Sequence, residues 1–479
     1  MALHYFTIHA HFYQPPREDP LTGYIPHEIG AAPFPNWNER IHAECYRPNA
    51  ELRNFEQISF NIGPTLSAWM EQHDAETYRK IIEQDRVNVR RYGVGNAMAQ
   101  AYNHTILPLA SYRDKVTQVA WGIADFEHRF GRRPQGMWLP EAAVDLETLY
   151  VLARQGIEFT ILAPWQAASL DLDSTEPYFV NLGDGRRITV FFYERELSTR
   201  ISFDAGATTN ADVFAKYILQ AYFRPDKSER GEPQLVLLAS DGELYGHHQH
   251  YRDRFLARLV DGASNQLGIR STYPALWLKS YPPHNSIGIR EQTSWSCHHG
   301  VGRWLGACAC TPGDGNWKAQ LRYVFEHLAG EIDRLYLDVT RTLFDDPWTL
   351  RDRYIHVILN RCSIEQLLEG MTGHALTSAQ VRRVHLMLEA QRERQRMFTS
   401  CGWYFDEFDR IEPRNNVAYA AQAVRLARLA TGVDLEPAIV TELHRIASQR
   451  NPQLRASSVF QGHMRRAEGV ETIKIGYAD

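Results

Sequence analysis

Short apolar runs alternate with amphipathic stretches over roughly the first 280 residues of this 479-residue chain. The apolar runs have the length of buried strands, and the amphipathic stretches have the period of helices. Two of these stretches are followed by a glycine, a common helix end. The alternation predicts a parallel α/β barrel or a related open sheet. The predicted strands are residues 5–8, 58–62, 159–162, 188–193 and 235–239, and the helices with glycine ends are residues 112–130 and 146–154.

The pattern changes near Asn316, where apolar residues begin to recur at helical spacing and few strand signals remain. Residues 316–448 therefore read as a helical bundle, and the more polar tail from Gln449 onward receives no assignment. A chain of this length is too long for one ordinary core. We expect a β/α barrel over residues 1–315 and a helical C-terminal domain over residues 316–479.

Composition limits the classes of partner. The chain carries 52 basic and 57 acidic residues, a net charge of -5, which gives no reason to expect nucleic acid or a membrane surface. The N-terminal residues lack the features of a signal peptide, and no stretch approaches the ~20 apolar residues of a membrane span. Six cysteines in a chain this long do not form a disulfide framework. We expect a cytoplasmic, reduced protein.

Four segments share one layout, in which an apolar run is followed by polar or charged residues. In a β/α barrel the C-terminal strand ends build the active site. In the first segment His9 and His11 alternate, so both side chains point to the same side of an extended chain. A Pro/Gly-rich loop, residues 14–38, follows and fits either a functional loop or a solvated excursion. The four segments are residues 4–16, 93–109, 136–143 and 235–250.

Two acids in these segments carry the sharpest signals. Glu141 follows Pro140 after a short apolar run, and Asp241 follows a run apolar enough to be a central strand. If the fold brings both strand ends to one barrel mouth, the acids form the carboxylate pair that glycoside cleavage needs. The alternative is that each acid caps the start of a helix.

A second group of residues has several possible roles. His9 and His11 could contact sugar hydroxyls, bind a metal or be structural, and we favour sugar contacts. His248 begins a helix-like stretch and fits a site or a solvated face. Trp403 follows a strongly helical segment and is predicted to line a sugar subsite, with bundle core as the alternative.

Residues 295–310 combine aromatic, histidine and cysteine side chains. Trp295, Trp304 and His299 could line a sugar subsite. The cysteines, together with His298 and His299, could bind zinc, but their spacing is not one of the usual structural patterns. We therefore favour buried thiols and assign no metal, and whether this cluster binds one stays open. The cysteines in question are Cys297, Cys308 and Cys310.

The four segments resemble, in order, the motifs of glycoside hydrolase family 57, whose members act on α-glucans and related α-glycosides. The first motif has two alternating histidines followed by Gln-Pro, and here Phe12 and Tyr13 are inserted before the glutamine. The second motif is weaker, and its best part is residues 104–109. The positions that match the first two motifs are His9, His11, Gln14, Pro15 and His104.

The third motif of the family carries a nucleophilic glutamate after a tryptophan, which Trp138 and Glu141 fit. The fourth carries an acid/base aspartate in an Asp-x-Glu context, which Asp241 and Glu243 fit. The fifth differs, because residues 291–304 have no carboxylate after the glutamate that begins them. The chain resembles a subgroup that departs here from the better-studied members.

The resemblance implies an incomplete (β/α)7 barrel followed by a C-terminal helical bundle. It also implies a retaining glycoside hydrolase or transglycosylase of the α-amylase, 4-α-glucanotransferase or branching-enzyme kind, without a cofactor, acting on an oligosaccharide or polysaccharide. Glu141 would be the nucleophile and Asp241 the acid/base. The predicted substrate-binding residues are His9, His11, Gln14, His104, Trp138, Glu243, His248, Trp295, His299, Trp304 and Trp403.

Two other functions fit the same residues. Paired histidines with an aspartate at strand ends suit a metal-dependent carbohydrate deacetylase or an α-mannosidase-like hydrolase. A non-catalytic glycan-binding protein on a degenerate barrel is the third candidate, and the intact pair Glu141 and Asp241 argues against it. The acceptor, linkage, chain length and oligomeric state stay open.

Overall fold

A computed structural model describes residues 3–313 and 315–468, and their contacts divide the chain into two compact units. The barrel unit comprises Met1–Gln14, His27–Tyr102 and Asp125–Ser296. The helical unit comprises Pro15–Pro26, Asn103–Ala124 and Cys297–Asp479. This division differs from the predicted boundary at residue 315, because residues 297–313 and two segments of the N-terminal part pack among the helices.

The barrel unit is built on parallel strands. The first sheet has the order β4 (Met137–Trp138), β3 (Ala97–Gln100), β2 (Ser59–Ile62), β1 (Leu3–Phe12) and β8 (Pro233–Asp241), with β9 (Arg270–Ser271) also pairing with β1. The second sheet has the order β5 (Phe159–Leu162), β7 (Arg187–Phe192) and β6 (Tyr178–Asn181), of which only β6 is antiparallel.

Two links join these sheets into a ring. A parallel bridge between Gly136 and Phe159 continues β4 into β5. The N–H of Glu194, just after β7, donates to the carbonyl oxygen of Leu237 in β8 at 2.7 Å. In chain order β1, β2, β3, β4, β5, β7 and β8 thus form the seven parallel strands of the predicted incomplete (β/α)7 barrel.

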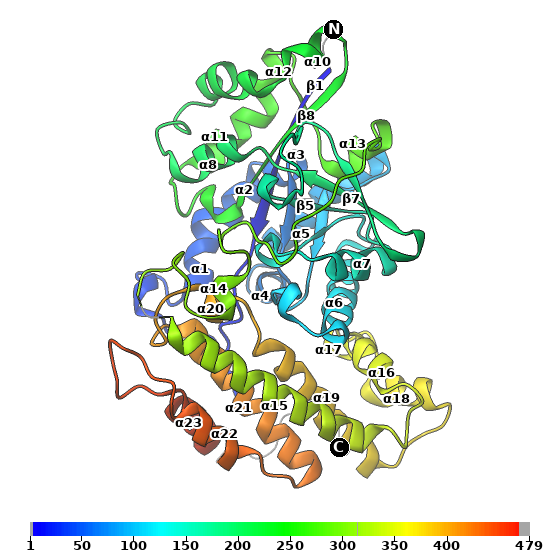
Figure 1. Cartoon of the computed structure of the whole chain (residues 1–479), viewed down its shortest axis with the longest axis vertical. Coiled ribbons are helices and arrows are strands. Elements are labelled where there is room, and N and C mark those ends of the chain that lie inside the picture. Colours follow the sequence, from blue (N-terminus) through cyan, green and yellow to red (C-terminus); the bar gives the residue numbers. More distant parts are fainter. Residues whose placement is uncertain (1–2, 314, 469–479) are drawn as a thin grey trace. The chain divides into compact units, whose positions relative to one another are not determined.

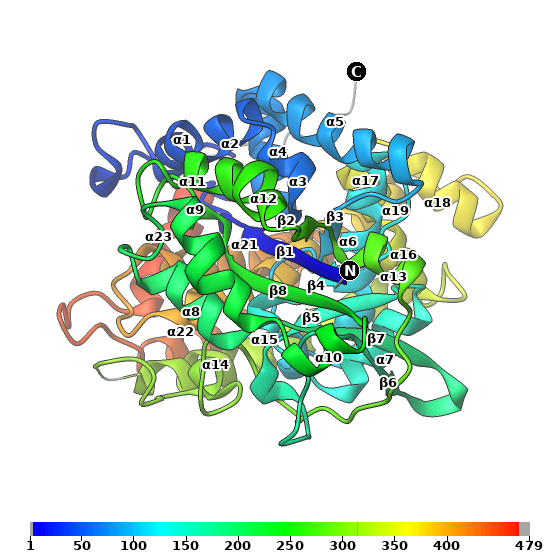
Figure 2. The same ribbon diagram turned by 90° about the horizontal axis from the view of Figure 1, so that it is seen from above.

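Helices between the strands cover the outside of the sheet. Figure 2 shows α5 (Ala75–Tyr92) and α8 (Arg195–Phe203) on opposite sides of β1 and β8. The strands are largely buried, and β8 is buried over residues 234–240. The helices α6 (Tyr112–Phe130) and α7 (Leu146–Arg154) have the predicted bounds.

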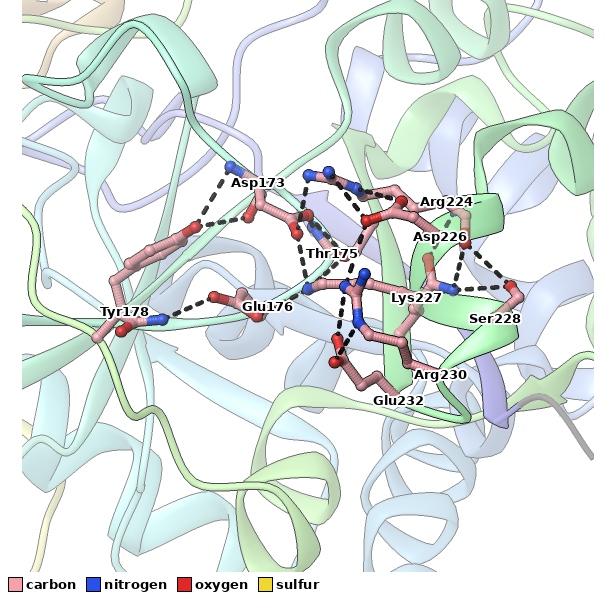
Figure 3. A network of polar contacts seen from close by, with 12 residues as sticks. Asp173, Thr175, Glu176, Tyr178, Arg224, Asp226, Lys227, Ser228, Arg230 and Glu232 are labelled. Atoms are coloured by element: carbon pink, nitrogen blue, oxygen red, sulfur yellow. Dashed lines mark hydrogen bonds and ion pairs between the residues drawn. The ribbon is translucent and has the colours of Figure 1, made fainter.

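A network of ion pairs fixes the entry to β8 (Figure 3). The buried ammonium group of Lys227, on α10 (Pro225–Glu229), lies 2.6 Å from a carboxylate oxygen of Asp173 and 2.7 Å from one of Glu176. The N–H of Leu235 donates to the carbonyl oxygen of Thr175 at 2.9 Å. These contacts hold the segment before β6 against the start of the strand that ends in Asp241.

The helical unit contains the predicted bundle. The helices α15 (Asn316–Thr340), α19 (Ser378–Arg396) and α21 (Ile411–Thr431) lie side by side (Figure 1). Within the tail that received no assignment, α23 (Ala456–Glu468) packs on α21 and α22 (Glu436–Leu443), and residues 469–479 lie outside the described residues. In the described part of the chain no helix is both long and apolar enough to cross a membrane.

Candidate active site

The two predicted catalytic acids lie at C-terminal strand ends. Asp241 is the last residue of β8 and pairs in register with His11 of β1. Glu141 follows three residues after β4. The strands β4 and β8 are the two ends of the five-strand path, and β5 and β7 close the ring between them. Because the strands of this ring run parallel, their C-terminal ends lie at one rim of the barrel, and both acids belong to that rim. Their side chains also interact electrostatically.

The backbone at Glu141 is held in a conformation that L-residues rarely adopt. Its φ is 58° and its ψ is 21°, and Ala142 has a φ of 46°. Such positions cost on the order of 1–3 kcal/mol each and persist where neighbouring structure enforces them. Residues 293–295 hold this conformation in place. Val144 forms an antiparallel bridge with Thr293, and the N–H of Trp295 donates to the carbonyl oxygen of Glu141 at 2.9 Å.

Two adjacent residues, Trp295 and Ser296, also bind the Glu141 carboxylate. The indole N–H of Trp295 donates to Oε2 at 3.0 Å, and the hydroxyl of Ser296 donates to Oε2 at 2.6 Å. Hydrogen bonds to an ionised carboxylate are about twice as strong as neutral ones. They hold the Glu141 side chain in place. Trp295 is thus a partner of Glu141, and its predicted sugar contact stays a prediction. No local pattern in the sequence pointed to Ser296.

Asp241 has a strongly perturbed carboxyl group. Asp241 is exposed at the rim, but protein atoms crowd its carboxyl group and exclude part of the water around it. This desolvation, followed by the negative charge of Glu141, raises the pKa of Asp241 to about 7. An acid that holds its proton up to about neutral pH, on the same rim as a hydrogen-bonded carboxylate, fits the division of roles that glycoside cleavage requires.

Glu243 lies two residues beyond Asp241 but faces the interior. It is 6% exposed, and its Oε1 accepts the phenol of Tyr46 at 2.6 Å and the N–H of Tyr13 at 3.0 Å. Burial, with the Asp241 charge as a lesser contribution, raises the pKa of Glu243 to about 8, although the Tyr46 hydrogen bond opposes the shift. Glu243 joins the loops after β1 and β8, and its predicted substrate contact stays a prediction.

The alternating histidines form a buried layer under the rim. The ring of His9 contacts Ser59 at 2.9 Å through Nδ1 and Asn61 at 3.2 Å through Nε2, and His11 contacts Asn61 at 3.2 Å through Nδ1. Both rings stack on Trp138. Burial lowers the pKa of His9 to about 3 and that of His11 to about 4, so both rings are neutral at pH 7.

This layer bears on two predictions. His9 and Trp138 are each 0% exposed, so the structure contradicts direct sugar contacts for these two residues. Since both ring nitrogens of His9 already have partners, this arrangement also counts against a metal site built on the paired histidines. His11 is 5% exposed and lies directly beside Asp241, which leaves its predicted contact untested.

Other predicted substrate contacts lie inside the protein. Trp304 and Trp403 are each 0% exposed, and the indole N–H of Trp403 donates to the carbonyl oxygen of Lys318 at 3.2 Å. The predicted subsite role is wrong for both tryptophans, because a side chain without exposed surface cannot contact a substrate. Trp403 takes the alternative role, bundle core.

Gln14 and His104 are also nearly buried, at 6% and 2% exposed. Gln14 donates to the phenol oxygen of Tyr46 at 3.1 Å, and Nδ1 of His104 lies 2.6 Å from the Ser400 hydroxyl. Each side chain therefore fixes a loop within its own unit. His248 is exposed, and its predicted contact stays a prediction.

Comparison with known proteins agrees with this architecture. The model of glycosyl hydrolase family 57 matches residues 4–275, and that of a domain of unknown function (DUF3536) matches residues 314–478. A maltose-forming amylase from Pyrococcus sp. ST04 superposes with a TM-score of 0.73 at 18% identity, over 96% of this chain and 88% of that one. A branching enzyme from Pyrococcus horikoshii gives 0.63 at 16% identity, over 95% and 96%. At these identities the likeness shows the fold.

Two curated relatives match parts of the sequence. Alpha-amylase 1 of Dictyoglomus thermophilum is 27% identical over 218 residues, which are 43% of this chain and 29% of that protein. A 1,4-alpha-glucan branching enzyme of Thermococcus kodakarensis is 20% identical over 353 residues, 57% of this chain and 50% of that protein. The chain thus spans half or less of these relatives. Because the family model matches more than half of this chain, the chain belongs to glycosyl hydrolase family 57.

Proposed function

We propose that the chain is a retaining glycoside hydrolase or transglycosylase that acts on α-glucans or related α-glycosides. Glu141 is the nucleophile and Asp241 the acid/base. Membership of the family and the names of the two relatives, an α-amylase and a branching enzyme, support the substrate class. The observation that carries the assignment is the contrast at one rim between a carboxylate bound by Trp295 and Ser296 and a carboxyl group whose pKa is raised.

In the first step the Glu141 carboxylate attacks the anomeric carbon while the bond from that carbon to the leaving oxygen breaks. Asp241 transfers its proton to that oxygen, so the leaving sugar departs as a neutral alcohol. The product is a glycosyl ester on Glu141. The hydrogen bonds from Trp295 and Ser296 keep the attacking group in place, which reduces the entropic cost of reaching the transition state.

In the second step Asp241 acts as a base. Once Glu141 is esterified it has lost its negative charge, and that charge is one cause of the raised Asp241 pKa. The pKa of Asp241 therefore falls in the intermediate. The group stays the carboxylate left by the first step and accepts a proton from water or a sugar hydroxyl. The deprotonated oxygen attacks the anomeric carbon and releases Glu141, with overall retention of configuration.

Incubation with maltooligosaccharides followed by product sizing tests the function. Hydrolysis yields only shorter chains, whereas transfer also yields longer ones. Either product pattern supports the proposal if Glu141→Gln abolishes product formation. The control is Glu158→Gln, at an exposed glutamate of the same unit, which should leave product formation intact. Binding of the sugars without any product would favour the glycan-binding alternative. Activity lost with a chelator but kept in Glu141→Gln would favour a metal-dependent enzyme.

A further inference from the structure

Four potential metal ligands converge in residues 297–310 of the helical unit. They are Cys297, His299, Cys308 and Cys310, and their ligand atoms all lie within 4.8 Å of one another. We call these four residues the sulfur cluster. Among the residues that the structure describes, no other group of His, Cys, Asp or Glu side chains meets the same requirement for a metal site.

The distances within the sulfur cluster are those between ligands around a single ion. The sulfurs of Cys297 and Cys308 are 3.6 Å apart, and Nδ1 of His299 lies 3.2 Å from the sulfur of Cys308 and 3.3 Å from that of Cys310. With zinc–sulfur bonds of about 2.3 Å and zinc–nitrogen bonds of about 2.0–2.1 Å, the edges of a tetrahedral site are roughly 3.5–3.8 Å. Small side-chain movements therefore suffice for all four ligands to reach one ion.

The backbone around the cluster is arranged to support thiolates. The N–H groups of His299 and Arg303 form hydrogen bonds to the sulfur of Cys297, and the N–H of His298 forms one to the sulfur of Cys310. Hydrogen bonds from the second shell orient metal ligands and stabilise their charge. Cys297 thus receives two backbone donors and Cys310 one.

A buried cation balances the charge of the site. Three thiolates around a divalent ion carry a net charge of -1. The side chain of Lys318 is 0% exposed, its ammonium group donates to the carbonyl oxygen of Arg303 at 3.3 Å, and it interacts electrostatically with Cys297 and Cys308. A buried ammonium group is costly without an opposite charge. The Asp406 carboxylate supplies one and the Arg303 guanidinium opposes it, and metal-bound thiolates would add to the favourable interaction.

We propose that the sulfur cluster binds one zinc ion as a closed, structural Cys3His site. Thiolate-rich tetrahedral ligation favours zinc, and four protein ligands leave no open position for substrate. On binding, each of the three thiols releases its proton to solvent, and three zinc–sulfur bonds and one zinc–nitrogen bond form. The proposal is independent of the glycosidase assignment, and it gives His299 a role other than the predicted sugar contact.

The position of the site explains what the ion would do. Residues 297–313 contain only one short regular element, α14 (Gly302–Leu305), so few backbone hydrogen bonds order this stretch. A metal cross-links its two ends, with Cys297 and His299 on one side of α14 and Cys308 and Cys310 on the other. His299 is exposed and Cys308 and Cys310 are half-buried, so an ion can enter from solvent. The expectation of buried thiols holds only for Cys297.

The test is metal analysis of the full-length chain, purified with reductant and titrated with ZnCl₂. The wild type should hold about one zinc per chain, and Co²⁺ in its place should give the visible d–d bands of a tetrahedral thiolate site. Cys308→Ser and Cys310→Ser should each lose most of this binding. Cys362→Ser, at a half-buried cysteine outside the cluster, should keep all of it.

A second variant separates loss of the site from loss of folding. Cys310→His replaces one zinc ligand by another and should retain zinc with a weaker cobalt–thiolate charge-transfer band. A reduced wild type that is folded by circular dichroism but takes up no zinc overturns the proposal. Full zinc binding by Cys308→Ser and Cys310→Ser overturns it too. A Cys297–Cys308 disulfide that persists under reductant and blocks zinc uptake would also overturn it.

Discussion

At the scale of single residues, the roles of the two catalytic acids depend on their hydrogen bonds and charges. Glu141 receives two side-chain donors, and Asp241 is desolvated and repelled by Glu141. The identity of these acids could be predicted, because each follows an apolar run in its own local segment. The donors could not be predicted, because Ser296 lies 155 residues from Glu141 and only the fold brings the two together.

The raised pKa of Asp241 predicts a loss of activity at alkaline pH. The first step needs the protonated acid, so kcat/KM should fall as the pH rises past about 7, the pKa of this group in the free protein. The measurement is a pH–rate profile with an α-glucoside. A substrate with a good leaving group is the control, because it needs little protonation and should lose less. An alkaline limb of equal steepness for both substrates would contradict the acid role.

Removal of the Ser296 hydroxyl should weaken the hold on the nucleophile. A hydrogen bond to a charged group contributes about 1.5–3 kcal/mol, so Ser296→Ala should lower kcat roughly 10- to 100-fold if that contribution is lost in the transition state. Ser296→Thr keeps a hydroxyl and should recover part of the rate. Ser286→Ala, at an exposed serine of the same unit, is the control. Unchanged kcat in Ser296→Ala at unchanged melting temperature would show that the hydrogen bond does not assist catalysis.

At the scale of elements, prediction succeeded where a local pattern was strong. The strand Phe159–Leu162 and the helices Tyr112–Phe130 and Leu146–Arg154 have the predicted bounds. The bounds of β3 and β4 could not be predicted, although each strand lies in one of the four segments expected to end a strand. The strand β3 has the sequence AMAQ without β-branched or aromatic residues, and β4 has only two residues. Pairing with β2 and β5, rather than intrinsic propensity, makes these segments strands.

The short helix α20 (Cys401–Tyr404) belongs to the core of the helical unit. The ring of Trp403 packs edge-on against Phe325, and the guanidinium of Arg322 lies 4.7 Å from its centroid. Trp403→Ala should lower the free energy of unfolding by about 3–5 kcal/mol through the cavity that it creates. KM and kcat of the folded enzyme should not change. Denaturant unfolding and kinetics check this, and a changed product length at unchanged stability would restore the subsite role.

At the scale of the whole molecule, composition and periodicity predicted a barrel followed by helices. They could not show that residues 15–26 and 103–124 join the helical unit, because both segments lie between barrel strands in the sequence. The sequence also could not predict that the ligand atoms of residues 297–310 lie close together, because each half of the cluster has an unusual ligand spacing. Such groupings depend on tertiary contacts that no local pattern encodes.

The central claim is that Glu141 forms a covalent glycosyl intermediate. The most direct test incubates Asp241→Ala with α-glucosyl fluoride and maps the labelled peptide by mass spectrometry. Fluoride leaves without a proton, and the second step lacks its base, so the intermediate should accumulate as a hexosyl ester on Glu141. The double variant Glu141→Gln, Asp241→Ala should carry no label. A hexosyl group on a different carboxylate, or fluoride release that yields the inverted sugar without an adduct, would contradict the account.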